Sequence, residues 1–255
     1  MNKDLELALE LADIADTITR ANFRDHELVV ESKPDMSLVS AADRNAEETL
    51  RKHLTAVRPD DGVVGEEFGE TKGSSGLRWV LDPIDGTHNY VRGVPVWATL
   101  IAAERDGDAV AGVVSAPALG RRWWASRGHG AFAASVEGEV EEARIKVSNV
   151  RRLEDAHLSS GWDKMLADPR YLALSRECWR TRGFGDFWSL VLVAEGAVDI
   201  AIEPGYHWDL VAPNLIVEEA GGKVTDMQGG PSIPAEVAVA TNGHLHDAVL
   251  AALKG

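Results

Sequence analysis

The segment 79–90, with the sequence WVLDPIDGTHNY, constrains this chain more than any other part of it. Apolar residues typical of a buried strand lead into two aspartates, Asp82 and Asp85, with a proline between them. Gly86 and Thr87 follow directly and are placed to begin a helix. Two carboxylates at a strand exit predict a divalent cation, because hard cations prefer oxygen ligands. A helix start favours an anion. The segment therefore predicts a cation and an anion bound side by side.

Composition places the chain among ordinary globular proteins and narrows its partners. With 255 residues, 45% hydrophobic and 26% charged, the chain is long enough to bury a sizeable core. Its net charge of −15 argues against a nucleic-acid or anionic membrane surface, because such partners need a basic footprint. A small phosphorylated molecule is still allowed, provided that bound cations reverse the local field.

Cysteine usage and the N-terminus indicate the compartment. The single cysteine, Cys178, cannot form an internal disulfide, which favours a reducing cytoplasm. The first residues mix acids with leucines and do not resemble a signal peptide. No apolar run approaches the roughly 20 residues that a membrane helix needs. We therefore expect a cytoplasmic protein without a membrane partner.

Hydrophobic periodicity predicts a mixed α/β chain in two halves. We expect helices at 5–23, 41–56, 168–179, 187–195, 209–220 and 245–253. We expect strands at 62–65, 97–103, 109–115, 198–202 and 237–240, with more strands around the tryptophans at 123 and 124. The polar segment 70–76 is typical of a turn, and 135–143 of an exposed hairpin near a boundary. This gives an N-terminal α+β half of about 1–145 and a C-terminal α/β half of about 146–255.

Three further acids stand at the ends of other predicted elements. Glu66 and Glu67 end one strand, and Asp209 opens a helix. If the fold brings them to Asp82 and Asp85, five mutually repelling carboxylates converge, and divalent cations would relieve the repulsion. Two such cations, bridged by Asp82 and about 3.5–4 Å apart, could clamp a phosphate and activate a water. Each feature alone also has a structural reading: a solvated pair, a plain turn or a helix N-cap at Asp209.

Four motifs together resemble the inositol monophosphatase-like superfamily of Mg²⁺-dependent phosphatases. They are KPDMSLVSAAD at 33–43, GEE at 65–67, WVLDPIDGT at 79–87 and WDLVAPNLIVEEAGG at 208–222. Their order and spacing match the family over nearly the whole chain. The resemblance implies a single unit spanning residues 1–255 with the layered αβαβα sugar-phosphatase fold, commonly a homodimer. It also implies two or three Mg²⁺ ions per subunit, with Mn²⁺ as an alternative.

The resemblance implies metal ligands residue by residue. Glu66, Asp82 and the backbone carbonyl of Ile84 would bind the first ion. Asp82, Asp85 and Asp209 would bind the second ion. Glu66 would also help to hold a weaker third ion.

The same resemblance implies catalytic and phosphate-binding residues. Thr87, supported by Asp43, would orient the nucleophilic water, with Glu67 close by. Asp85, Gly86 and Thr87 would also contact the phosphate.

Two departures from the family pattern and one loop residue complete the implied site. Ser40 stands where the family usually has threonine and keeps the hydroxyl. His88 stands where threonine, lysine or arginine is common, so it either tunes substrate choice or is an exposed side chain without a role. Lys33 would lie on the mobile loop that closes over the metals.

Three other segments, 89–102, 115–126 and 183–201, resemble the histidinol-phosphate phosphatases of histidine biosynthesis within this superfamily. This resemblance implies hydrolysis of histidinol phosphate by a metal-activated water. Asp186 would pair with the substrate ammonium group through a charge-assisted hydrogen bond, and Glu203 is a second candidate contact. Asp186 also suits the N-cap of the next helix. The regions after Glu203 and around 159–162 are shorter than in that group, which leaves a broader specificity open.

Other functions remain as alternatives. The same chemistry would serve an inositol-1-monophosphatase or another small phosphate-ester or nucleotide phosphatase. A non-catalytic, transcription-associated family member would not need the complete ligand set found here. A calcium-binding structural module takes its ligands from one short loop, whereas these acids span more than 140 residues.

Overall fold

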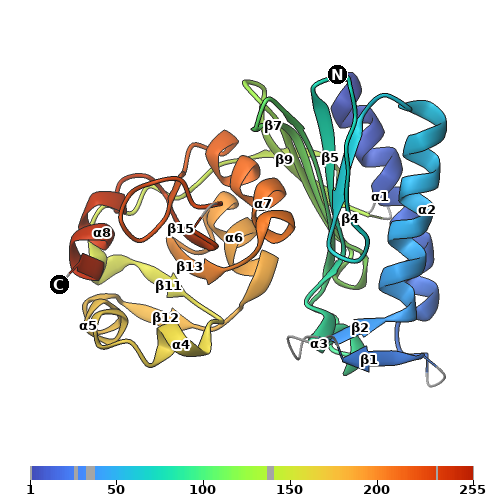
Figure 1. Ribbon diagram of the computed structural model, residues 1–255. Coiled ribbons are helices and arrows are strands. Elements are labelled where there is room, and N and C mark those ends of the chain that lie inside the picture. Colours follow the sequence, from blue (N-terminus) through green and yellow to red (C-terminus); the bar gives the residue numbers. More distant parts are fainter. Residues whose placement is uncertain (1, 26–27, 33–37, 137–140, 234, 255) are drawn as a thin grey trace.

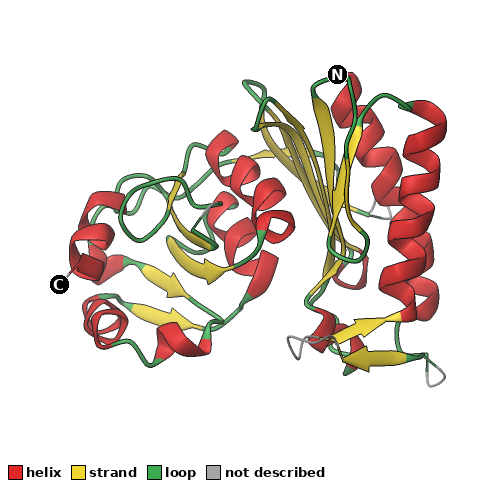
Figure 2. Ribbon diagram, viewed as in Figure 1, coloured by secondary structure: helices red, strands yellow, loops and turns green. Residues whose placement is uncertain are grey.

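Helices and sheets alternate in five layers in the computed structural model, which describes residues 2–25, 28–32, 38–136, 141–233 and 235–254 (Figure 1). Helices α1 (Lys3–Asn22) and α2 (Ala41–Val57) form one outer layer beside the larger sheet. Helices α6 (Asp186–Ala194) and α7 (His207–Glu219) separate this sheet from the smaller one. Helices α5 (Pro169–Glu177) and α8 (His246–Lys254) cover the far side (Figure 2). The layered α/β prediction is therefore confirmed.

The larger sheet has eight strands in the order β10-β9-β8-β7-β6-β5-β3-β4. Their bounds are β3 (Gly62–Gly65), β4 (Gly69–Thr71), β5 (Leu77–Asp85), β6 (Ala98–Arg105), β7 (Asp108–Ala116), β8 (Arg121–Ser126), β9 (Gly130–Ser135) and β10 (Ala143–Ile145). Strands β3 and β5 are parallel, with Gly65 opposite Leu81, and the other neighbours run antiparallel. Parallel pairing brings the carboxyl ends of β3 and β5 to the same edge, so the acids that follow Gly65 lie near Asp82.

Strand β5 continues past Asp82, so the predicted strand end lies at the second aspartate. It includes Pro83 and ends at Asp85, with a register shift against β6 between Asp82 and Asp85. Such an irregularity suits proline, which cannot donate a ladder hydrogen bond. The Pro83 carbonyl instead accepts a hydrogen bond from the Thr99 hydroxyl at 2.8 Å. The bulge turns the strand while keeping both carboxylates at the sheet edge.

Each face of the larger sheet is covered by a helical layer. Leu11 of α1 and Leu50 of α2 pack against Trp79 on one face. Helix α7 packs on the other face, where a Cβ added at Gly112 would lie 3.1 Å from the Ala212 Cα. A larger residue at position 112 would therefore displace the helix that carries Asp209.

The smaller sheet has five strands in the order β12-β11-β13-β15-β14. Their bounds are β11 (His157–Ser159), β12 (Arg180–Arg182), β13 (Ile200–Pro204), β14 (Lys223–Thr225) and β15 (Val237–Thr241). Its outer core joins Leu174 of α5 and Val249 of α8 to Ile202 of β13. Strands β11, β12 and β14 were not predicted, because three-residue strands leave no periodic pattern.

Short elements complete the described chain. They are β1 (Val30–Ser32), β2 (Leu38–Ser40), α3 (Thr87–Val91), α4 (Asp163–Leu166) and the 3₁₀ helices η1 (Pro117–Leu119) and η2 (Leu153–Asp155). Strand β4 occupies part of the predicted turn 70–76. The predicted hairpin at 135–143 lies partly outside the described residues, although β9 and β10 pair antiparallel on either side.

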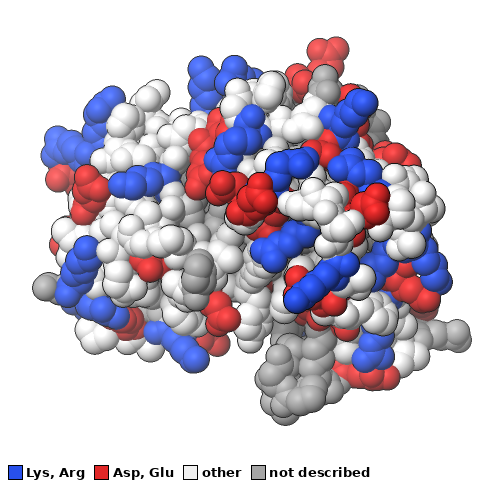
Figure 3. All heavy atoms as spheres, turned by 45° about the horizontal axis from the view of Figure 1, so that its top comes forward, with Lys and Arg blue, Asp and Glu red and all other residues white. Residues whose placement is uncertain are grey.

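The described residues bear on the expected absence of membrane and nucleic-acid partners. None of the described helices is long and apolar enough to cross a membrane. On the face shown in Figure 3, acidic and basic side chains are interspersed over the described residues.

Candidate active site

Three carboxylates meet where the end of β5 faces the start of α7. The side chains of Asp82, Asp85 and Asp209 each offer an oxygen, and these oxygens all lie within 4.8 Å of one another. Asp82 and Asp85 come from the bulge of β5, and Asp209 comes from the first turn of α7. Asp82 is 1% exposed, whereas Asp85 and Asp209 are partly buried. Residues 127 positions apart in sequence thus form one acidic cluster, as the sequence predicted.

Glu66 lies beside this cluster without joining its closest group. Its backbone N–H donates to the Leu81 carbonyl at 3.2 Å, directly before Asp82. Its charge is the strongest charged influence that raises the pKa of Asp82. Its carboxylate is not among the described oxygens that lie within 4.8 Å of one another.

Burial and mutual repulsion raise the pKa values of the clustered acids. Burial is the main cause that raises the pKa values of Asp82 and Asp85 well above the usual range, and neighbouring carboxylates add to it. Burial also raises the pKa of Asp209 to about 7. Closely spaced acids in this setting are stabilised by opposite charge. The all-carboxylate donor set fits a hard divalent cation such as Mg²⁺, so the cluster could hold a metal ion.

Asp209 combines its place in the cluster with a role at the start of α7. It is the third residue of the helix, and its Oδ2 accepts a hydrogen bond from the Tyr206 backbone N–H at 2.7 Å. The alternative prediction that Asp209 is the N-cap is therefore wrong, because Tyr206 is the N-cap residue. The reach back to Tyr206 fixes the Asp209 carboxylate toward β5.

The prediction that Asp186 also serves as the N-cap of α6 is wrong. Gly185 is the N-cap residue and Asp186 is the first helical residue, with a positive φ of 50°. Asp85 caps the helix from the other half of the molecule, because its Oδ2 accepts the Phe187 backbone N–H at 2.8 Å. The Asp186 side chain makes no capping hydrogen bond, so its carboxylate is available to the site.

Asp186 lies over the turn that carries Gly86 and His88. A Cβ added at Gly86 would lie 3.5 Å from the Asp186 Oδ2 and 3.1 Å from the Val96 carbonyl oxygen. Desolvation by the surrounding protein raises the pKa of Asp186, and positive charge on His88 opposes that increase. Both Asp186 and His88 keep exposed side chains. Two of the predicted substrate contacts are therefore close enough to influence each other, although only Asp186 lines the cavity.

Asp43 and Thr87, the two residues predicted to orient the water, come from the first turn of α2 and from the start of α3. Asp43 is fully buried, accepts the Ser40 backbone N–H at 2.8 Å, and has a pKa that burial raises to about 7. Its Oδ1 has no hydrogen-bond partner among the described residues. The Thr87 hydroxyl donates to the Ile84 carbonyl at 3.0 Å, which leaves its lone pairs to accept from another group. Both side chains retain acceptor capacity for a water molecule.

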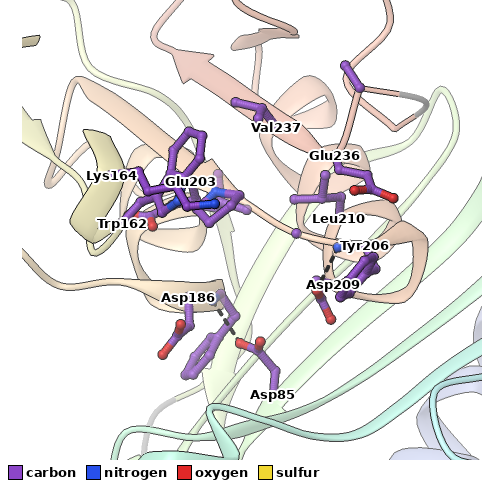
Figure 4. A pocket seen from close by; sticks show the side chains of 15 residues that line it. Asp85, Trp162, Lys164, Asp186, Glu203, Tyr206, Asp209, Leu210, Glu236 and Val237 are labelled. Carbon is purple, nitrogen blue, oxygen red and sulfur yellow. Dashed lines mark hydrogen bonds between the residues drawn. The ribbon is translucent and has the colours of Figure 1, made fainter. Parts of the chain in front are cut away.

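A cavity of about 550 Å³ extends from Asp85 and Asp209 between α6 and α7. Figure 4 shows Asp85, Asp186 and Asp209 on one side of it, with Trp162, Lys164 and Glu203 toward the other. Its size and its largely acidic charged lining suit a small ligand that carries positive charge away from its phosphate.

Glu203 is the most buried acid of the cavity wall. It is 2% exposed, and the Gly161 backbone N–H donates to its two oxygens at 2.9 and 3.1 Å. Burial raises its pKa to about 8, and the charge of Asp186 adds to the increase. Glu203, which the sequence analysis named as a candidate substrate contact, thus lines the cavity.

Several cavity residues were missed from the sequence. They are Trp162, Lys164, Tyr206 and Glu236, all on loops or short helices. No local pattern marks them. Glu47 of α2 was also missed, although its four-residue spacing from Asp43 places both on one helix face. Lys33, predicted to lie on a mobile loop, falls outside the described residues.

Comparison with known proteins extends these observations to the whole chain. The profile of the Inositol monophosphatase family matches residues 1–255. The chain is 52% identical to the histidinol-phosphatase of Mycobacterium tuberculosis, over 98% of this chain and 97% of that protein. It is 36% identical to the inositol-1-monophosphatase of Rhizobium meliloti, over 80% of this chain and 77% of that protein. The extragenic suppressor protein SuhB of Bartonella henselae has a similar structure, with a TM-score of 0.89, 33% identity and 99% coverage of both chains.

Proposed function

This chain belongs to the inositol monophosphatase family, and we propose that it is a metal-dependent histidinol-phosphatase that releases histidinol and phosphate. The observation that carries the proposal is the pair of acids, Asp186 and Glu203, in the cavity beside the acidic cluster. A phosphate at the cluster would place its alcohol in this cavity. Histidinol phosphate carries an ammonium group on that alcohol, whereas inositol phosphate is uncharged there.

The acidic cluster supports a ligand set that the family resemblance implies. We assign Glu66, Asp82 and the carbonyl of Ile84 to one Mg²⁺ ion, and Asp82, Asp85 and Asp209 to a second, with Mn²⁺ as an alternative. A third, weaker ion would share Glu66. Bound cations would offset the carboxylate charge, attract the phosphate oxygens and make a water more acidic.

The chain's own groups would prepare the reaction. Thr87 and Glu67 would accept hydrogen bonds from the attacking water and direct its lone pair at phosphorus, and Asp43 would support Thr87. The backbone N–H groups of Gly86 and Thr87 would donate to phosphate oxygens. Water attack forms the new P–O bond while the bond to the alcohol oxygen breaks. The attacking water gives up one proton to solvent, and the alcohol oxygen receives one proton from solvent.

Recognition of the alcohol would depend on the cavity acids. Asp186 would accept a hydrogen bond from the substrate ammonium, and such charge-assisted bonds are stronger than neutral ones. Glu203 lies deeper, and a bound cation would favour its ionised form. His88, beside Asp186, would adjust the charge at the cavity mouth.

The larger organisation is also part of the proposal. We infer a single unit whose halves, 1–145 and 146–255, contribute opposite walls of the site, and which acts in the cytoplasm as a homodimer. Sedimentation of the purified protein would test the dimer. A monomer at micromolar concentration would contradict it.

Substrate preference tests the proposed function directly. Phosphate release with saturating Mg²⁺ would be compared for histidinol phosphate, inositol 1-phosphate and adenosine 3′,5′-bisphosphate. We expect kcat/KM to favour histidinol phosphate by about tenfold or more, because only that ester presents a positively charged group to Asp186 and Glu203. An equal or greater efficiency with the inositol ester would overturn the substrate assignment. Loss of activity in a chelator would support the metal requirement.

A further inference from the structure

The turn 66–68, which follows β3 and carries Glu66 and Glu67, is held from behind by a buried carboxylate. Glu47 of α2 is fully buried, and its Oε2 accepts the Glu67 backbone N–H at 2.8 Å. Its Oε1 accepts the Phe68 backbone N–H at 3.2 Å. Two consecutive peptide groups of the turn therefore point at one side chain, which fixes the orientation of the turn.

Arg51, one helical turn after Glu47, extends the same hold. Its Nε donates to the Glu47 Oε1 at 2.7 Å. Its two terminal nitrogens donate to the Gly69 carbonyl and, at 3.2 Å, to the Thr71 hydroxyl. The guanidinium group thus links Glu47 to β4 and offsets its charge beside two other glutamates. Arginine suits this position because its planar fork presents several donors at fixed angles.

Gly65 makes the close approach possible. A Cβ added there would lie 2.1 Å from the Glu47 Oε1 and 2.4 Å from its Cδ. No side chain fits in that space unless Glu47 moves. The glycine that precedes Glu66 therefore serves the contact with Glu47, since only glycine permits so close a backbone approach.

Glu47 acts through the turn and is not itself placed as a metal ligand. Its Oε1 already accepts two hydrogen bonds and its Oε2 accepts one, all from N–H donors. Asp43, Glu47 and Arg51 follow one another at four-residue spacing on the same face of α2. One helix face thus carries Asp43, which is proposed to support Thr87, and the two residues that hold the turn.

We propose that Glu47 and Arg51 are positioning residues that set Glu66 for metal binding and Glu67 for contact with the attacking water. This inference rests on the proposed metal-dependent phosphatase function. Without Glu47 and Arg51, the turn 66–68 would lose its two N–H contacts with α2, and the position of Glu66 near Asp82 would no longer be fixed. Residues that orient metal ligands in this way commonly change metal affinity or activity by about 10–100-fold when they are replaced.

Glu47→Gln tests the inference because it keeps the shape and replaces one acceptor oxygen with a donor. Mg²⁺ binding would be measured by calorimetry on the metal-free protein, together with the Mg²⁺ dependence of phosphate release. We expect the Mg²⁺ concentration for half-saturation to rise about tenfold or more, with a lower kcat at saturating Mg²⁺. Arg51→Met, at a less buried position, should change both quantities in the same direction and carries the test if the Glu47 variant does not fold.

Asp16→Asn is the matched control. Asp16 is also a buried carboxylate on an N-terminal helix, and it pairs with Arg122 at 2.7 Å away from the acidic cluster. We expect it to lower the melting temperature while leaving Mg²⁺ half-saturation within about twofold of wild type. Wild-type Mg²⁺ binding and kcat in folded Glu47→Gln and Arg51→Met would overturn the inference. An equal loss of Mg²⁺ binding in Asp16→Asn would do the same.

The calorimetric measurement separates this inference from the proposed substrate. If the wild-type protein binds Mg²⁺ but does not hydrolyse histidinol phosphate, the substrate assignment fails. The weaker Mg²⁺ binding expected of Glu47→Gln and Arg51→Met would still support the positioning role.

Discussion

The Oδ2 of Asp85 accepts the backbone N–H of Phe187 at 2.8 Å, and this contact joins the bulge of β5 to the start of α6. The first N–H groups of a helix have no partner within the helix. Gly185 has no side chain, and Asp186 makes no capping bond, so the cap comes from the other sheet. Asp85 therefore links the acidic cluster to the helix that carries Asp186. Metal binding at the cluster and the position of the proposed substrate contact Asp186 would therefore depend on the same carboxylate.

Asp85→Asn should abolish turnover without unfolding the protein. Asparagine keeps an oxygen that can accept the Phe187 N–H, but it removes one of three crowded charges. We expect activity to fall by more than about 100-fold, because a direct ligand matters more than the residues that orient it. The metal-free variant should melt at the wild-type temperature or above it, since repulsion is relieved. Differential scanning fluorimetry with and without Mg²⁺ would show that the ion no longer raises its melting temperature.

The exposed Asp106 in the β6–β7 turn provides the control for this substitution. Its positive φ of 53° suits asparagine equally well. Asp106→Asn should keep wild-type activity and the wild-type response to Mg²⁺. Near-normal activity in Asp85→Asn would rule out the proposed metal ligation.

The metal-free protein should become less stable as the pH rises from 6.5 to 8.5. The folded pKa of Asp209 is about 7, against an ordinary value of 3.8, and those of Asp82 and Asp85 are raised as well. The folded state therefore holds protons that the unfolded state has already released. The stability from these groups is fully present below the unfolded pKa and is lost as the pH passes the folded pKa.

Urea unfolding at several pH values would measure this loss in a chelator and in saturating Mg²⁺. We expect the free energy of unfolding to fall by a few kcal/mol in the chelator. With Mg²⁺ the decline should become smaller, because bound cations favour the ionised acids of the cluster. The part that remains should come from Asp43 and Glu203, whose pKa values burial raises to about 7 and about 8. Parallel profiles in the two conditions would contradict a cation site at these residues.

Asp186→Asn should weaken recognition of the cationic alcohol while sparing the chemistry. Asparagine tolerates the left-handed conformation at φ 50°, so the start of α6 should remain intact. Hydrogen bonds to charged groups contribute about 1.5–3 kcal/mol. We therefore expect KM for histidinol phosphate to rise about tenfold or more, with little change for a neutral ester such as glycerol 2-phosphate.

Steady-state kinetics on the two esters would provide the measurement. Asp163→Asn, an exposed change in α4 that does not line the cavity, is the control and should leave both KM values unchanged. Equal losses on both esters in Asp186→Asn would assign Asp186 to phosphate or metal binding instead of the alcohol.

Local pattern accounts for the parts of this fold that were predicted correctly. The long helices α1, α2 and α7 were recognised because their apolar residues recur at helical spacing or end at clear stop signals. The cluster of Asp82, Asp85 and Asp209 was predicted because each acid stands at the end of an element.

Contacts between distant segments account for the errors. Asp186 looked like an N-cap because acids favour that position, yet Gly185 takes it and Asp85 supplies the cap from 102 residues away. The strand β5 runs through Pro83 because Thr99 of the neighbouring strand satisfies its carbonyl. Glu47 was missed because its partners lie in the turn 66–68, and a helix sequence alone does not name them.

The buried His246 should make the protein sensitive to mild acid. It is fully buried, with Nε2 2.9 Å from the Thr225 hydroxyl and Nδ1 3.0 Å from the Thr241 hydroxyl. Burial, with a smaller contribution from the charge of Lys223, lowers its pKa from 6.5 to about 4. Between these values the unfolded chain binds a proton that the folded protein excludes. The stability is therefore complete above pH 6.5 and is lost as the pH falls toward 4.

A variant comparison isolates this effect from the acidic cluster. A shift of this size corresponds to about 3 kcal/mol over the whole range, and about 2 kcal/mol between pH 7 and pH 5. His246→Asn should be less stable than wild type at pH 7, because it leaves a poorer fit between the two threonines. The difference between them should narrow by about 2 kcal/mol at pH 5, since asparagine does not titrate. Urea unfolding in Mg²⁺ would measure the free energies of unfolding of wild type and His246→Asn at pH 7 and pH 5. The exposed substitution His129→Asn is the control. A constant difference across this range would mean that His246 is protonated in the folded protein.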